Sequence, residues 1–255
     1  MLRIEGISRS FGGVYAVRDI SMEVQPGELR GIIGPNGAGK STLFHLIAGH
    51  LRPDNGRILL RDQAIDRLRP HQRANLGIGI VYQGARIFRG MSVLENVMVG
   101  AHCRARHGFW AAAVRSPRSR REDRRLCELA EKLLGDVGLG DYGGQAAESL
   151  PLGQQRSLQL ARALALDPVV LLLDEPASGL RAAEREHLVR LIRRLRAGGL
   201  TILLVEHDVA LVTSVADRIT VLDLGRVIAE GPPAVVREDP TVIRAYLGTP
   251  EASVS

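Results

Sequence analysis

The stretch from residue 34 to residue 42 carries the residue types that a phosphate-binding loop needs. It reads Gly34-Pro35-Asn36-Gly37-Ala38-Gly39-Lys40-Ser41-Thr42. The glycines let the backbone curl so that successive N–H groups point at the phosphates of a nucleotide. Lys40 brings a positive charge to the β- and γ-phosphates, and the Ser41 hydroxyl can bind Mg²⁺. A ligand-free glycine turn would not need this Lys-Ser pair, so the loop predicts binding of ATP or GTP.

Two carboxylates follow an aliphatic run in the second half of the chain. Residues 170–173 read Val-Leu-Leu-Leu, and Asp174 and Glu175 come directly after them. Ligands of open α/β sheets bind at the carboxyl ends of the strands, where these side chains would lie. We expect Asp174 to hold Mg²⁺ from the side opposite the loop, and Glu175 to orient or deprotonate the water that attacks the γ-phosphate.

Two further polar residues follow predicted strands. His207 comes after the aliphatic run at 201–205, and Gln83 comes after the run at 79–82. A histidine at this position is often structural, but the sheet edge is the one that carries Asp174. We therefore predict that His207 reaches the γ-phosphate and that Gln83 reaches Mg²⁺ or the attacking water.

The elements that must position these residues follow from hydrophobic patterning. Continuous apolar runs, flanked by glycine and proline, are typical of strands that are buried on both faces. Leucine, alanine and valine recur at helical spacing between residues 126 and 137, and residues 84–160 are mostly helical in texture. The sequence thus predicts an α/β core with an inserted helical segment. Strands are expected at 2–7, 14–17, 20–24, 29–33, 56–60, 79–82, 169–173 and 201–205, and a helix at 41–48.

The composition is that of a globular protein without a disulfide framework. The chain has 255 residues, of which 45% are hydrophobic and 24% charged, an ordinary globular balance. Two cysteines are too few for a disulfide framework, as in a reducing compartment. The net charge of +6 does not indicate nucleic-acid binding, because the basic stretch at 115–125 lacks aromatic residues that could stack on bases. That stretch is either a solvated face or a contact for an anionic partner.

The motifs together resemble those of an ATP-binding-cassette (ABC) ATPase. Residues 34–42 match the Walker A loop, residues 170–175 the Walker B strand, Gln83 the Q-loop and His207 the switch histidine. Residues 150–156, which include Gly153 and Gln154, fall at the signature motif. Phe11 matches the aromatic position on which adenine stacks in this family, although it could also be a core residue of the small sheet.

The resemblance extends to one branch of the family. The segments at 91–102, 153–164 and 227–248, with a long insertion at about 103–147, look like the larger ATPase subunit of branched-chain amino acid importers. This implies a P-loop NTPase core with an N-terminal antiparallel β subdomain and an inserted helical subdomain. The domains implied are the core at 1–83 and 161–230, the helical and signature part at 84–160, and a helical tail at 231–255.

The resemblance also implies partners and a location. ATP and Mg²⁺ would be the cofactors of an ATPase on the cytoplasmic face of the inner membrane. A second ABC ATPase subunit, membrane permeases and, indirectly, a periplasmic binding protein would be its partners. Urea or short amides are alternative solutes. A switch acting on nucleic acid or ribosomes is a competing function, but such proteins carry two cassettes or a long coiled coil, which this chain lacks.

Two departures from the family pattern concern the signature side. Pro151 stands where the family has serine, and Arg181 stands where it prefers Asp or Asn. Proline has neither a hydroxyl nor an N–H to offer a phosphate. We expect one competent and one weakened site in a heterodimer, and poor turnover as a homodimer. Two alternatives stay open, namely a weakly hydrolysing partner subunit, and a Pro151 that is tolerated because helix amides do most of the binding.

Overall fold

The computed structural model describes residues 1–102 and 117–247, and the chain divides into two compact units. The first unit comprises Met1–Arg73, Leu172–Glu175 and Ile192–Ser255, and the second comprises Ala74–Leu171 and Pro176–Leu191. Part of the insertion predicted at 103–147, part of the basic stretch at 115–125 and the end of the tail lie outside the described residues. The domain boundaries expected from the sequence stay a prediction.

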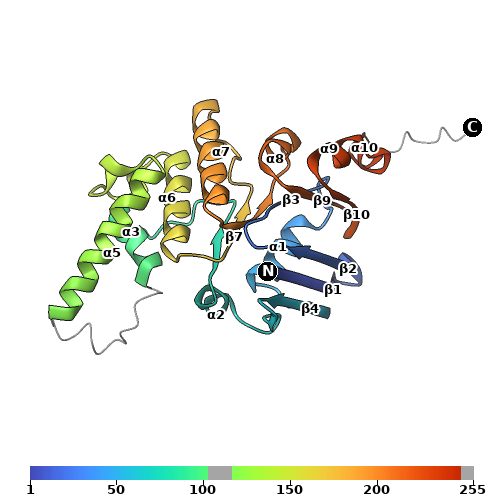
Figure 1. The fold of residues 1–255 in the computed structure, drawn as a ribbon, viewed down its shortest axis with the longest axis horizontal. Coiled ribbons are helices and arrows are strands. Elements are labelled where there is room, and N and C mark those ends of the chain that lie inside the picture. Colours follow the sequence, from blue (N-terminus) through green and yellow to red (C-terminus); the bar gives the residue numbers. More distant parts are fainter. Residues whose placement is uncertain (103–116, 248–255) are drawn as a thin grey trace, which may run out of the picture. The chain divides into compact units, whose positions relative to one another are not determined.

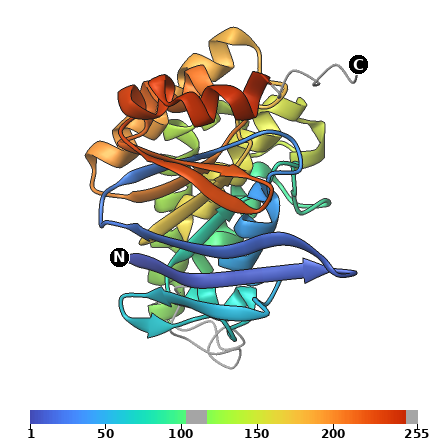
Figure 2. The ribbon, with the colours of Figure 1, turned by 90° about the vertical axis from the view of Figure 1, so that its right-hand side faces the viewer.

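An antiparallel sheet occupies the N-terminal part of the first unit, and Figure 2 shows its two long strands β1 and β2 in blue. The strand order is β2-β1-β4-β5. The two short strands predicted at 14–17 and 20–24 are one strand, because Asp19 (φ 53°) absorbs the irregularity without ending it. The strands are β1 (Leu2–Phe11), β2 (Val14–Val24), β4 (Asn55–Leu60) and β5 (Gln63–Ala64).

A second sheet forms the core of the first unit. Its strands lie in the order β10-β9-β3-β8-β7, with β3 parallel to both β8 and β9, and β10 antiparallel to β9. Every residue of β3, β7 and β8 is buried, which explains their unbroken aliphatic runs. The strands are β3 (Leu29–Ile33), β7 (Val170–Asp174), β8 (Thr201–Val205), β9 (Arg218–Asp223) and β10 (Arg226–Gly231).

Helices cover both sheets of the first unit. Helix α1 begins within the predicted phosphate loop and contacts β2 of one sheet and β8 of the other. It starts at Lys40, one residue before its predicted start. Helix α8 packs on β3, and α9 and α10 pack on β10. The helices are α1 (Lys40–Ala48), α2 (Pro70–Asn75), α8 (Val209–Val215), α9 (Pro233–Glu238) and α10 (Pro240–Leu247).

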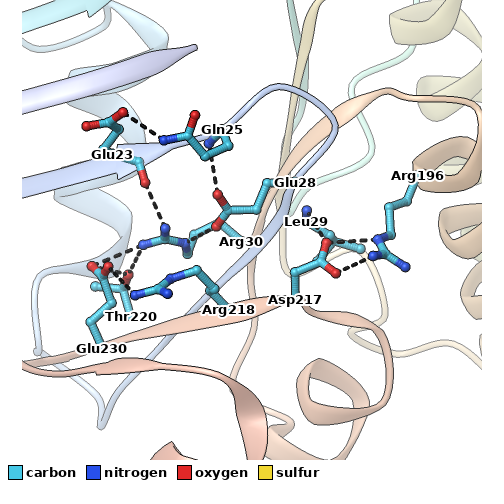
Figure 3. A network of polar contacts seen from close by, with 10 residues as sticks. All are labelled: Glu23, Gln25, Glu28, Leu29, Arg30, Arg196, Asp217, Arg218, Thr220 and Glu230. Atoms are coloured by element: carbon cyan, nitrogen blue, oxygen red, sulfur yellow. Dashed lines mark hydrogen bonds and ion pairs between the residues drawn. The ribbon is translucent and has the colours of Figure 1, made fainter.

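A buried ion network holds β3 to its neighbours (Figure 3). The Arg30 guanidinium is 1% exposed and donates to Glu28 (2.6 Å), to the Thr220 hydroxyl (3.0 Å) and to the backbone carbonyl of Glu23 (2.7 Å). It also pairs with Glu230 of β10 at 3.0 Å. A buried guanidinium is stabilised only when its donors are paired in this way, so the network fixes the strand that leads into the loop.

The second unit is mainly helical. Helices α3, α5 and α6 pack on one another, as Figure 1 shows in green and yellow, and Ala130, Leu134 and Val137 of the predicted apolar stripe are buried. Strand β6 adjoins β7 where β7 enters this unit. Its main elements are β6 (Ile78–Val81), α3 (Val93–His102), α5 (Pro117–Asp136), α6 (Leu152–Ala165) and the first part of α7 (Ala182–Ala197). In the described part of the chain, no helix is both long and apolar enough to cross a membrane.

The predicted fold class is confirmed by these elements. The core is α/β, the N-terminal sheet is antiparallel, and the segment between the phosphate loop and the Asp174 strand contains the inserted helices.

Candidate functional site

The phosphate loop joins the end of β3 to the first residue of α1. Gly34 (φ 153°) and Gly39 (φ 101°) adopt conformations that side chains rarely allow. A Cβ atom at Gly34 would lie 2.1 Å from the Leu222 carbonyl oxygen, and one at Gly39 would lie 2.3 Å from that of Ala16. The loop is thus held so tightly against neighbouring backbone that only glycine fits at these positions. That its curled N–H groups and the N-terminus of α1 bind phosphate stays a prediction.

Lys40 lies inside this loop. Its side chain is 7% exposed, and Nζ donates to the carbonyl oxygens of Gly34 (2.6 Å) and Pro35 (2.9 Å). Burial lowers the pKa of the Lys40 ammonium, and the carboxylates of Glu175 and Asp174 oppose that shift. Ser41 follows with an exposed side chain at the start of α1, in reach of a ligand from solvent.

Asp174 ends β7 in the same unit and is 7% exposed. Burial, together with the nearby charges of Glu175 and Glu206, raises the pKa of its carboxyl from 3.8 to about 6, and Lys40 partly offsets the rise. Asp174 and Glu175 both act on Lys40, and Glu206 acts on Asp174, so the carboxylates outnumber the single lysine and leave an excess of negative charge. A divalent cation would relieve that excess.

Glu175 and His207 come together as the sequence predicts. Glu175 has φ 44°, an uncommon conformation for a residue other than glycine, and its backbone N–H donates to the Val205 carbonyl (2.9 Å). Glu175 directly follows the buried strand β7. Residues held in such uncommon backbone conformations cluster at functional sites. His207 Nδ1 lies 3.7 Å from Glu175 Oε2 and also 3.7 Å from Glu206 Oε2. Glu206, 1% exposed, was given no role by the sequence reasoning.

Phe11 is the last residue of β1, in the same unit as the phosphate loop. It is 47% exposed, so it is not the core residue that the alternative interpretation required. Its role as a base-stacking residue stays a prediction.

The C-terminal end of α1 is capped by Arg73, a buried arginine to which the sequence analysis gave no role. The Arg73 guanidinium donates to the carbonyls of Leu46 (2.6 Å) and Ile47 (2.7 Å) in the last turn of α1, and to Leu68 (3.0 Å). Burial lowers its pKa to about 10, against the attraction of Asp66. A cation is favourable at the C-terminus of a helix. Arg73 therefore supports the helix whose other end faces the phosphates.

The tail also reaches the loop. The phenol of Tyr246, in α10, accepts a hydrogen bond from the backbone N–H of Gly34. Burial raises the pKa of this phenol, and the hydrogen bond partly opposes the rise. The carbonyl of the same glycine accepts from Lys40 Nζ, so Tyr246 and Lys40 contact the same residue of the loop. No motif in the tail signalled this contact.

Gln83 follows β6 in the second unit, with an exposed side chain. The segment around it is held by Gln159 of α6, whose amide accepts from Tyr82 N–H (2.7 Å) and donates to the Gly84 carbonyl (3.1 Å). Gln159 is 1% exposed, a polar residue within the buried face of an otherwise apolar stretch of helix. A glutamine on the apolar face of a helix is the feature of the sequence from which a structural role of Gln159 could have been predicted. The part of Gln83 in the nucleotide site stays a prediction.

The signature residues form the N-terminus of α6. Pro151 is the N-cap, with no side-chain hydrogen bond to the helix, as expected of a residue without a hydroxyl. A Cβ atom at Gly153 would lie 2.7 Å from Glu184 Oε1, so a carboxylate lies close to this helix end. Glu184 also accepts from the Arg181 N–H (2.8 Å) at the start of α7. The binding roles of Gly153 and Gln154 stay predictions.

The residues at the Lys40 site fit Mg²⁺. Hydroxyl and carboxylate oxygens, here Ser41 and Asp174, are the ligands that this ion prefers, and phosphates and water complete its shell. Among the described residues no group of three His, Cys, Asp or Glu side chains could hold a metal without such help.

Family models match most of the chain. Residues 17–178 match the model described as ABC transporter, and residues 226–252 match the model described as branched-chain amino acid ATP-binding cassette transporter. The second match covers β10, α9 and α10, which include Glu230 of the ion network and Tyr246.

Individual relatives align over nearly the whole length. The chain is 40% identical to the high-affinity branched-chain amino acid transport ATP-binding protein LivG of Escherichia coli K12, over 97% of this chain and 98% of LivG. It is 38% identical to BraF of Pseudomonas aeruginosa, with 97% and 98% covered. Among solved structures, the ADP conformation of MJ1267, an ATP-binding cassette of an ABC transporter, is similar with a TM-score of 0.81 and 29% identity, covering 98% of this chain and 99% of that one.

Proposed function

Since this chain belongs to the ABC transporter family, we propose that it is the ATPase subunit that powers an importer of branched-chain amino acids. As a member of the family it binds and hydrolyses ATP. The choice of solute rests on one observation, the full-length similarity to LivG that includes the C-terminal segment 226–252.

Different residues of the first unit bind the phosphates, the base and Mg²⁺ and activate the attacking water. The loop amides and Lys40 bind the β- and γ-phosphates, and Phe11 stacks on adenine. Ser41 and Asp174 hold Mg²⁺, which neutralises phosphate charge when it is bound. Glu175 accepts a proton from the water that attacks the γ-phosphate. His207, beside Glu175, contacts the γ-phosphate.

The remaining residues belong to a two-subunit mechanism. Gly153 and Gln154 at the N-terminus of α6 bind the γ-phosphate of ATP held by a second ABC ATPase subunit. Gln83 joins the attacking water or Mg²⁺ and couples closure of the pair to membrane permeases. A periplasmic binding protein delivers the solute, and the chain works on the cytoplasmic face of the inner membrane.

Uptake of labelled solute tests the proposal. Replacing the chain by Glu175→Gln in its host should abolish uptake of labelled leucine and leave uptake of labelled urea unchanged. Loss of urea uptake with intact leucine uptake would assign the chain to a urea or amide importer instead. Recovery of the chain with membrane permeases, rather than with ribosomes, is the second expected result.

A second candidate function rests on the N-cap of α6. Pro151 offers no donor to a phosphate, so the chain would be the weakly hydrolysing partner of a more active subunit. Measuring ATP turnover of the chain together with its partner subunit, in the parent and in Glu175→Gln, distinguishes the two: turnover that Glu175→Gln leaves unchanged favours the weak partner.

A further inference from the structure

The Phe11 ring has a cation on one face. The Arg9 guanidinium carbon lies 5.0 Å from the centroid of this ring. Residues two apart on a strand project to the same face, which brings these side chains together near the end of β1. Contacts of this kind hold an aromatic ring in one orientation, because the cation is attracted to the negative face of the ring.

Asp54 holds Arg9 in turn. Its carboxylate accepts from Arg9 Nη1 (2.7 Å), from the Ser10 N–H (2.8 Å) and from the Ser10 hydroxyl (2.9 Å). The hydrogen bonds from Ser10, with the attraction of Arg9, lower the pKa of Asp54, so it is ionised at neutral pH. One carboxylate therefore fixes both residues that precede Phe11.

The need for this support is visible in the sheet. The last pair between β1 and β4 is Ser8 with Asn55, and the register between β1 and β2 shifts on either side of Arg9. After Phe11 the chain turns at Gly12 and Gly13, and a Cβ atom at either would meet nothing within 4 Å. On the β4 side, the Asp54 carboxylate thus replaces the ladder contacts beyond Ser8, while β2 pairs with β1 as far as Phe11.

We propose that Arg9 and Asp54 are positioning residues that hold the Phe11 ring in place for stacking of the nucleotide base. This inference rests on the proposed function, which assigns stacking to Phe11. Arg9 covers one ring face and Phe11 is half exposed, so the base takes the other face. Because the ring is already ordered, the base does not bear the entropy cost of ordering it. The contribution concerns the base alone and leaves the phosphates to the loop.

The test compares a ligand that has a base with one that has none. Binding of ATP and of inorganic tripolyphosphate is measured by competition against a fluorescent nucleotide. Arg9→Gln should weaken ATP by about two- to fivefold, the range for an exposed cation–π contact. Asp54→Asn should weaken ATP at least as much, since it releases Arg9 and Ser10 together. Neither change should alter the affinity for tripolyphosphate.

The same hairpin provides a matched control. The guanidinium carbon of Arg18 lies 5.3 Å from the centroid of the Tyr15 ring, and within residues 1–102 and 117–247 no carboxylate pairs with Arg18. Arg18→Gln removes the same charge and a similar contact, and it should leave binding of both ligands unchanged. A loss of ATP affinity equal to that of Arg9→Gln would show a general effect of charge and overturn the inference.

Phe11→Ala separates this inference from the function on which it depends. Arg9→Gln should have no further effect on ATP in a Phe11→Ala background, because the ring it holds is gone. If Phe11→Ala weakens ATP while the Arg9 and Asp54 variants bind normally, the positioning role is wrong and stacking stands. If Phe11→Ala binds ATP normally, stacking itself is wrong. An equal loss of ATP and tripolyphosphate in the Arg9 variant would place its effect on the loop and contradict the inference.

Discussion

Asp174→Asn should stabilise the nucleotide-free protein while it abolishes efficient hydrolysis. The carboxyl is 7% exposed, and burial with the charges of Glu175 and Glu206 raises its pKa from 3.8 to about 6. At neutral pH the folded protein therefore holds an ionised group in a place that disfavours its charge. Asparagine has the same shape without the charge, so it removes this cost.

The size of this stability change and the pH range in which it occurs follow from the raised pKa of Asp174. A pKa that is higher in the folded than in the unfolded state favours folding at low pH, and this contribution is lost as the pH rises through the folded value. The contribution of Asp174 is therefore complete below pH 4 and lost above pH 6 to 7. One unit corresponds to about 1.4 kcal/mol, so the free energy of unfolding should rise by about 2 to 3 kcal/mol in Asp174→Asn at pH 8. Near pH 4 the two proteins should be nearly equal.

Urea denaturation of both proteins at pH 5, 6.5 and 8, without nucleotide or Mg²⁺, measures the difference directly. The variant should gain stability over the parent progressively as the pH rises. A difference that does not change with pH would mean that the Asp174 carboxylate is not strained by its neighbours. Lower stability of the variant at pH 8 would refute the reasoning altogether.

Three other substitutions test separate contacts. Arg73→Leu leaves the carbonyls at the end of α1 without donors and should lower the free energy of unfolding by about 3 kcal/mol in urea denaturation; a change within 0.5 kcal/mol would contradict the capping role. Tyr246→Phe removes the acceptor of the Gly34 N–H and should weaken ATP binding by about two- to tenfold, whereas an unchanged affinity would show that the tail does not support the loop. Pro151→Ser adds a phosphate donor at the N-cap of α6 and should raise ATP turnover at least about tenfold, and equal rates in parent and variant would remove Pro151 as the cause of a weak site.

Much of the first unit was predictable because its signals are local. The phosphate loop needs a fixed order of glycines, lysine and serine, and the buried strands β3, β7 and β8 are continuous aliphatic runs. The meeting of Asp174, Glu175 and His207 follows from topology, since parallel strands bring their carboxyl ends to one edge. These predictions required no knowledge of distant contacts.

The contacts that the sequence did not reveal are those between segments far apart in the chain. Arg73 looks like an ordinary surface arginine of a polar helix, yet it is 0% exposed and bonded to α1. Tyr246 touches Gly34 across more than two hundred residues. Asp19 adopts a left-handed conformation within β2. In the sequence, an aspartate at this position looks like a turn residue between two strands, so one strand was predicted as two. Polar side chains that bond to backbone leave no periodic pattern, so only the structure identifies their partners.

The proposed function depends on Lys40 and the loop around it, which bind the phosphates of ATP. Equilibrium binding of a fluorescent ATP analogue, with and without Mg²⁺, compares the parent protein with Lys40→Ala. We expect the variant to lose at least about a hundredfold in affinity, since a charge-assisted contact to phosphate is removed from a buried position. Binding of the analogue by Lys40→Ala as tightly as by the parent would contradict the proposed function of the loop.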